Sequence, residues 1–189
     1  MPLKPYVASA FLLAFHTAHA SPSINIKTSY YAVQGNDASS IQQSIQQNGP
    51  LGKNGERYHA VTSWNAQWSY RWLETGPLCR LTDVEVSIDV EYLLPQLAST
   101  EDIEKSYKIH WDKYFKALYK HEKQHKDFGV QAAIELEKEL LAIKNQQACQ
   151  KLDNKISATA QKVLDKYNRL EKEFDQATSH GINQGVKLP

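Results

Sequence analysis

The stretch Tyr-Lys-His-Glu-Lys-Gln-His-Lys at residues 119–126 contains one unbroken His-Glu-x-x-His motif. Residues four apart stand on the same face of an α-helix, so His121 and His125 could offer two imidazole nitrogens to one metal ion while Glu122 lies beside it. A zinc ion held in this way keeps a coordination position for water and lowers the pKa of that water to about 7. Glu122 would accept the proton of the water and pass it to the leaving amine. The motif therefore predicts a hydrolytic metal site on a helix.

The residues on either side of the motif continue a helical pattern. Apolar and aromatic side chains recur at spacings of three and four in a stripe that also holds both histidines: Ile103, Tyr107, Trp111, Tyr114, Leu118, His121, His125 and Phe128. Such a stripe faces the core, where two polar rings need partners; hydrogen-bonded core histidines are the alternative to metal ligands. An unbroken helix over residues 100–144 would be about 67 Å long, but a domain of this size is about 40 Å across. We therefore expect a bend near residues 127–129.

A third metal ligand must come from another part of the chain, because two histidines alone do not hold a catalytic zinc ion. His180 is the first candidate, since it is the only histidine after the motif and lies beside Gly181 at a predicted helix end. An exposed tail histidine is the alternative interpretation of His180, and Asp175 is the reserve ligand. The oxyanion of a transition state also needs a donor. The candidates for that role or for supporting the ligands are Tyr119, Tyr167 and His59.

The composition is typical of one globular domain with a leader. The chain has 189 residues, of which 41% are hydrophobic and 23% are charged. Residues 1–20 resemble a secretory signal peptide, with Lys4 near the start, an apolar run over residues 6–15 and an Ala-His-Ala cleavage signal at residues 18–20 before Ser21. A membrane anchor is the alternative, but it needs about 20 apolar residues. We expect a domain over residues 21–189 that is periplasmic or secreted and has no membrane span.

The charge balance and the cysteines add two predictions. Without Lys4 the mature chain would keep 21 of the 22 basic side chains beside 21 acidic ones. Because this balance gives no general attraction to a polyanion, nucleic acid is not an expected partner. Cys79 and Cys149 are an even pair in an exported protein, which favours one disulfide; two reduced buried thiols are the alternative.

The two halves of the chain have different patterns. Residues 23–33, 58–72 and 81–92 have the alternation and the β-branched or aromatic content of strands, and Asp37 can cap a short helix over residues 38–47. The second half contains the motif helix and then a second long amphipathic helix over residues 152–174. The predicted fold is α+β: a small antiparallel sheet in the N-terminal half, followed by a helical half whose motif helix lies along the sheet.

Several short sequence elements of this chain occur together in one known family. They are Tyr30-Tyr31-x-Val33-x-Gly35, Trp64 with Trp68, Gly76-x-x-Cys79, Leu94-Pro95, Trp111, the motif, Cys149 and Asp175-x-x-Thr178-x-His180-Gly181. With these elements, nearly all of the mature chain resembles the bacterial family catalogued as domain of unknown function 922, whose members are described as predicted secreted zinc-dependent proteases. The resemblance implies that the metal motif of the family corresponds to His121, Glu122 and His125, and it adds Thr178 and His180 to the site. Phe174 stands where we expect a tyrosine in the tail element.

The leading interpretation is a zincin-like metallopeptidase that holds one zinc ion and cleaves a peptide or protein substrate. Two other functions remain open. A periplasmic zinc-binding or assembly protein without catalytic activity would have a closed site of four protein ligands. A cell-wall amidase would use the same chemistry and would differ in its cleft.

Overall fold

The computed structural model describes residues 21–52, 55–99 and 103–188, so the predicted leader lies outside the described residues. In chain order the elements are β1 (Ser23–Val33), α1 (Ala38–Asn48), β2 (Val61–Thr75), β3 (Leu78–Leu97), α2 (Lys105–Leu141), β4 (Gln146–Gln147), α3 (Cys149–Thr178) and the 3-10 helix η1 (Ile182–Gln184). The predicted α+β arrangement, a sheet in the N-terminal half followed by helices, is confirmed. Within the described ranges every helix is too short or too polar to cross a membrane.

The sheet is mixed: the prediction that it is antiparallel is correct for the pairs β2–β3 and β3–β4 and wrong for the pair β1–β3. Strand β3 lies between the other two long strands: it pairs antiparallel with β2 and parallel with β1, where Ile24 lies beside Ile88. The chain reverses twice between β1 and β3, the second time at a turn where Gly76 has a φ of 59°, so these two strands run in the same direction. The short β4 pairs with β3. Among the described residues, β2 is therefore an edge strand.

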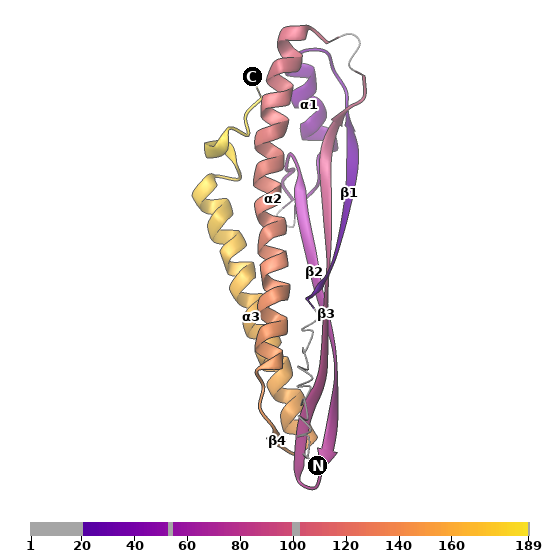
Figure 1. Ribbon diagram of the computed structural model, residues 1–189. Coiled ribbons are helices and arrows are strands. Elements are labelled where there is room, and N and C mark those ends of the chain that lie inside the picture. The colour runs from indigo at the N-terminus through magenta and orange to yellow at the C-terminus, as the bar shows by residue number, and fades with distance from the viewer. Residues whose placement is uncertain (1–20, 53–54, 100–102, 189) are drawn as a thin grey trace, which may run out of the picture.

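The sheet has one buried face and one solvent-exposed face. Alternate residues of β3 are buried, and these are Val84, Val86, Ile88, Val90 and Tyr92. Polar side chains lie on the opposite face, where the amide of Asn25 donates to Asp89. Helix α2 lies along the length of the buried face with α3 beside it (Figure 1). The alternation of the strand sequence thus determines which face the two helices cover.

Helix α2 is continuous over 37 residues, so the predicted bend near residues 127–129 is wrong. A helix of this length is about 55 Å long. The expectation of a bend assumed a nearly spherical domain, whereas the molecule is elongated (Figure 1). The strand predicted over residues 81–92 is shorter than the observed β3, which has 20 residues. At about 3.3 Å per residue, β3 is about 66 Å long. A sheet of this length gives the helix a buried surface along its whole course, and no break is needed.

A disulfide joins Cys79 of β3 to Cys149 at the start of α3, as predicted. The two residues are 70 apart in sequence, and in the chain-entropy description closing such a loop contributes on the order of 4 kcal/mol. The disulfide ties the first turn of α3 to the sheet. The other end of α3 is the end that carries Asp175.

Helix α2 and strand β2 approach each other closely at Gly129. A Cβ atom added to Gly129 would lie 2.6 Å from Cγ of Trp64 and 2.9 Å from its Cβ, which is closer than real atoms come. The indole ring of Trp64 therefore occupies the space that a side chain at position 129 would need. The ring is held on its other side, because its Nε1 donates a hydrogen bond of 2.8 Å to Glu171 Oε1 on α3. Trp64 thus connects β2, α2 and α3 one turn beyond His125.

We expect Gly129→Ala to lower the free energy of unfolding by about 1–3 kcal/mol, because the indole ring cannot move without breaking its bond to Glu171. Alanine gains up to about 1 kcal/mol in helix propensity over glycine, so the net effect is a loss. Urea unfolding followed by circular dichroism measures it. Gln131→Ala, at an exposed position of the same helix, is the control and should change stability by less than about 0.5 kcal/mol. Unchanged or higher stability of Gly129→Ala would contradict the packing described for Trp64.

Candidate metal centre

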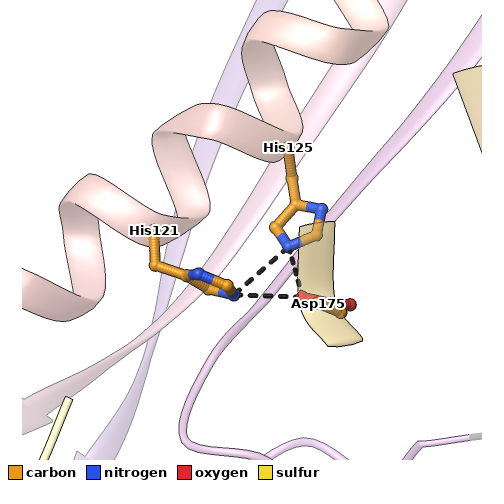
Figure 2. A group of neighbouring side chains, drawn as sticks. All are labelled: His121, His125 and Asp175. Carbon is orange, nitrogen blue, oxygen red and sulfur yellow. Dashed lines mark hydrogen bonds and ion pairs between the residues drawn. The ribbon is translucent and has the colours of Figure 1, made fainter. Parts of the chain in front are cut away.

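Two histidines of α2 and one aspartate of α3 bring three ligand atoms together (Figure 2). The Nε2 atoms of His121 and His125 are 3.3 Å apart, and Oδ1 of Asp175 lies 3.2 Å from the first and 3.0 Å from the second. Both histidines are buried, as the apolar stripe of the motif helix predicts. This group of three residues could hold a metal ion.

The spacing of the three atoms fits a small divalent ion. Zinc binds imidazole nitrogen and carboxylate oxygen at about 2.0–2.2 Å in tetrahedral geometry, which places neighbouring ligand atoms about 3.3 Å apart. The three distances of 3.0 to 3.3 Å match one face of such a tetrahedron. Two imidazoles and a carboxylate are also a ligand set that transition metals accept in proteins.

The outer nitrogens of both imidazole rings face oxygen acceptors. Nδ1 of His121 lies 3.0 Å from the side-chain oxygen of Gln184, and Nδ1 of His125 lies 3.3 Å from Oε1 of Glu171. Because both acceptors need a donor, each ring carries a proton on Nδ1. In neutral rings the lone pairs of both Nε2 atoms then converge on Asp175, where they need a cation between them. The hydrogen bonds around the rings therefore favour a bound cation.

The charges around the rings lead to the same conclusion. Burial alone would lower the pKa of His125, but its hydrogen bonds with Asp175 and Glu171 outweigh this and raise the pKa to about 10. Burial alone would raise the pKa of Asp175, but its hydrogen bonds with His121 and His125 hold the pKa well below its ordinary value. Two carboxylates thus stabilise positive charge at the ring of His125. A metal ion that binds there must displace a proton from His125.

Glu122 is buried beside this group. Its Oε2 accepts a hydrogen bond of 2.6 Å from the hydroxyl of Thr62 on β2, and burial raises the pKa of Glu122 although that hydrogen bond partly opposes the shift. A general base works best when its pKa lies near the working pH, so a raised pKa suits a carboxylate that must accept a proton from water. Thr62 also holds the carboxylate in one position. The role of Thr62 was not predicted.

His180 and Asp175 occupy different places around the group. Asp175, the reserve candidate, contributes the third atom of the group that could hold a metal ion. His180 lies outside the three atoms: its Nδ1 is 3.7 Å from the other oxygen of Asp175, and its side chain is 55% exposed. Its ring lies 5.4 Å from that of Tyr58, between centroids. Ser179 and His180 both have a left-handed backbone, with φ values of 50° and 51°, which turns the chain out of α3 directly after the helix ends.

The other candidates from the sequence lie in four different environments. His59 lines the cleft described below, and its Nδ1 is 3.0 Å from the hydroxyl of Tyr114. Thr178 bonds within the last turn of α3, donating to the main-chain oxygen of Phe174. Tyr167 donates to Glu135, and the ring of Tyr119 lies 5.9 Å from that of Tyr92. Neither Tyr119 nor Tyr167 lines the cleft.

The segment after α3 packs on the imidazole of His121. A Cβ atom added to Gly181, which has a φ of 82°, would lie 2.6 Å from Cγ2 of Val186 and 3.2 Å from Cγ of His121, so the turn packs tightly on the ring and favours glycine. The ring of Phe174 stacks on the same imidazole at 4.9 Å between centroids. Gln184 of η1 then holds Nδ1. The tail therefore fixes the orientation of His121.

Sequence reasoning missed three residues of the site, namely Thr62, Glu171 and Gln184. Glu171 lies four residues before Asp175 on α3, and this spacing could have placed both carboxylates on one face of the helix. Thr62 is one of several polar residues in an alternating strand, and Gln184 lies in a stretch without periodicity. Only the folded chain brings Thr62 to Glu122 and Gln184 to His121.

A cleft of about 1160 Å³ opens beside the group. Its walls come from the start of β2, from α2, from α3 and from the tail, and its lining includes His121, Glu122, His125 and Asp175. Residues 60–62, at the start of strand β2, form part of one wall. The ligand atoms and the buried carboxylate are thus accessible from one open space.

Comparison with known proteins identifies a family and no individual relative. No curated protein and no solved structure matches the chain. The profile of the family described as "Bacterial protein of unknown function (DUF922)" matches residues 28–181, a range that includes the motif, both cysteines and Asp175. The match covers well over half of the chain. The chain therefore belongs to the DUF922 family of bacterial proteins of unknown function.

Proposed function

We propose that this protein is a zinc-dependent metallopeptidase, with residues 21–189 as one zincin-like domain that is exported after removal of residues 1–20. The observation that carries the proposal is the meeting of three ligand atoms and the buried Glu122 in one open cleft. His121, His125 and Asp175 would hold the ion. Zinc in such a site leaves a position for water, lowers the pKa of that water and polarises a carbonyl group.

The protein side chains have separate tasks in the proposed reaction. Glu122 accepts a proton from the attacking water and gives it to the leaving amine, and its raised pKa suits both steps. The hydroxyl of Thr62 holds the carboxylate of Glu122 in place. Glu171 and Gln184 keep the outer nitrogens of the imidazoles protonated, so that the inner nitrogens are free to bind the ion.

The position of β2 supports a peptide as substrate. Among the described residues β2 pairs only with β3, and its first residues line the cleft next to Glu122. An extended peptide can add to such an edge through main-chain hydrogen bonds, which are the same for any sequence. The disulfide supports export, because disulfides persist in oxidising compartments.

The open cleft favours a catalytic site over a structural one. Structural zinc sites are closed by four protein ligands, whereas within the described ranges the group has three members. A cell-wall amidase would use the same residues. Peptidoglycan is therefore included among the substrates tested below.

We expect the purified protein to bind one zinc ion and to release about one proton per ion at pH 7, because the pKa of His125 is raised to about 10 without metal. Because zinc must displace this proton, the affinity for zinc should rise about tenfold per pH unit at pH values below that pKa. Calorimetry in two buffers of different ionisation enthalpy measures the proton count. Asp175→Ala should bind zinc much more weakly, and His110→Ala, at an exposed position of α2, should bind it normally. Equal binding by Asp175→Ala and the wild type would contradict the ligand set.

We expect Glu122→Gln to keep its zinc and to lose hydrolysis by a factor of about 10²–10⁴, because the amide can still accept a bond from Thr62 but cannot take a proton. Release of peptides from an unfolded protein and of fragments from purified peptidoglycan measures the activity. Glu139→Gln, an exposed carboxylate on the same helix, is the matched control and should retain full activity. Full activity in Glu122→Gln would refute its role as general base. Zinc binding without hydrolysis of either substrate by the wild type would favour a non-catalytic zinc protein.

A further inference from the structure

The cleft beside the metal group is lined by charged side chains of both signs. Among the described lining residues the basic side chains are Arg57, Arg169, Lys172 and Lys187, and the acidic ones are Glu122, Asp165, Glu171 and Asp175. The formal charges are equal in number. The two sets differ in their partners within the protein.

The acidic side chains already have donors. Glu122 accepts from Thr62, and Asp175 contacts both metal-site histidines. Glu171 accepts from Trp64 and faces His125. Asp165 accepts from the amide of Gln161 at 2.8 Å. Three of the four carboxylates thus lie in the metal group or directly beside it, where a bound divalent ion would add positive charge.

The basic side chains have little compensation. The side-chain ammonium groups of Lys172 and Lys187 make no ion pair or hydrogen bond with any residue in the described part of the chain. Arg57 donates to the main-chain oxygen of Gly49, which is a neutral acceptor, and Arg169 has only a long, exposed ion pair of 3.7 Å with Glu173. Apart from the metal group, Glu122 and Glu171, the described lining of the cleft therefore has four cationic side chains and one carboxylate, Asp165, which is an excess of positive charge.

Three of the cationic side chains, those of Arg57, Lys172 and Lys187, come from separate walls of the cleft. Lys172 precedes Asp175 by three residues on α3, a spacing that places both side chains on one face of the helix. Arg57 precedes Tyr58, whose ring contacts His180. Lys187 follows Val186, which is buried and whose main-chain N–H donates to the main-chain oxygen of Gly181 in the turn after α3. Each of the three is thus close in sequence to a residue that packs around the metal group.

We infer, on the basis of the proposed peptidase activity, that the cleft selects peptides with a carboxylate near the bond to be cleaved. Positive side chains in a cleft with low-dielectric walls raise the local concentration of anionic ligands, and complementary charge contributes more to specificity than to bulk affinity. The carboxylate comes from an Asp or Glu side chain of the substrate or from its free C-terminus. Lys172 and Lys187 are the residues that determine the selection.

The test compares three fluorescently labelled peptides of one sequence: one with Glu at the central positions and an amidated C-terminus, one with Gln there and an amidated C-terminus, and one with Gln and a free C-terminus. Binding to zinc-loaded Glu122→Gln protein is measured by anisotropy, so turnover does not enter. We expect the Glu peptide to bind at least about fivefold more tightly than the amidated Gln peptide, with the difference reduced by salt. Tighter binding of the free-terminus peptide than of its amidated form would assign the selection to the chain end.

The double substitution Lys172→Gln with Lys187→Gln should remove the preference. Lys155→Gln with Lys162→Gln is the control, because it makes the same change of net charge at exposed positions of α3 outside the cleft and should keep the preference. Equal affinity for the carboxylate-bearing and the neutral peptides, or a preference that survives loss of Lys172 and Lys187, would overturn the inference. Cleavage of the bound peptides by the wild type tests the peptidase proposal separately, so the two can fail independently.

Discussion

The contact between the indole ring of Trp64 and the backbone at Gly129 is the interaction on which the site depends. It sets the distance between strand β2 and helix α2, because there is no space for a side chain between them. The same ring donates to Glu171, and Glu171 faces Nδ1 of His125. One tryptophan therefore determines both the packing of the motif helix on the sheet and the orientation of a histidine one turn away.

The two histidines are oriented by different parts of the chain. His125 is held by Glu171 in the body of α3, whereas His121 is held by Gln184, Gly181 and Phe174 at the end of α3 and beyond it. The left-handed turn after Thr178 brings this tail back onto α2. The segment after Thr178 therefore helps to orient His121, although none of the three ligand atoms comes from it.

The charges and burial at the site suit both a cation at the histidines and a proton acceptor at Glu122. Asp175 and Glu171 stabilise positive charge on the imidazole of His125, and burial raises the pKa of the neighbouring Glu122. Buried charges that are only partly compensated reduce stability, and such groups are characteristic of functional sites. Outside the metal group the charge of the cleft lining is positive. The inner part of the cleft is thus suited to a metal ion and the outer part to an anionic ligand.

The amino-acid sequence by itself determined the strand and helix pattern, the disulfide partners and the alignment of His121, Glu122 and His125, because each depends on local periodicity or on a count of two cysteines. Only the tertiary structure decided that α2 runs straight, since the length of the sheet that supports it is a property of the whole molecule. It also decided the parallel pairing of β1 with β3, the approach of Asp175 and Gln184 to the histidines and the approach of Thr62 to Glu122. These contacts join segments 50 or more residues apart. They form because α3 and the tail pack against α2 and because α2 packs against β2, and no local sequence pattern encodes this packing.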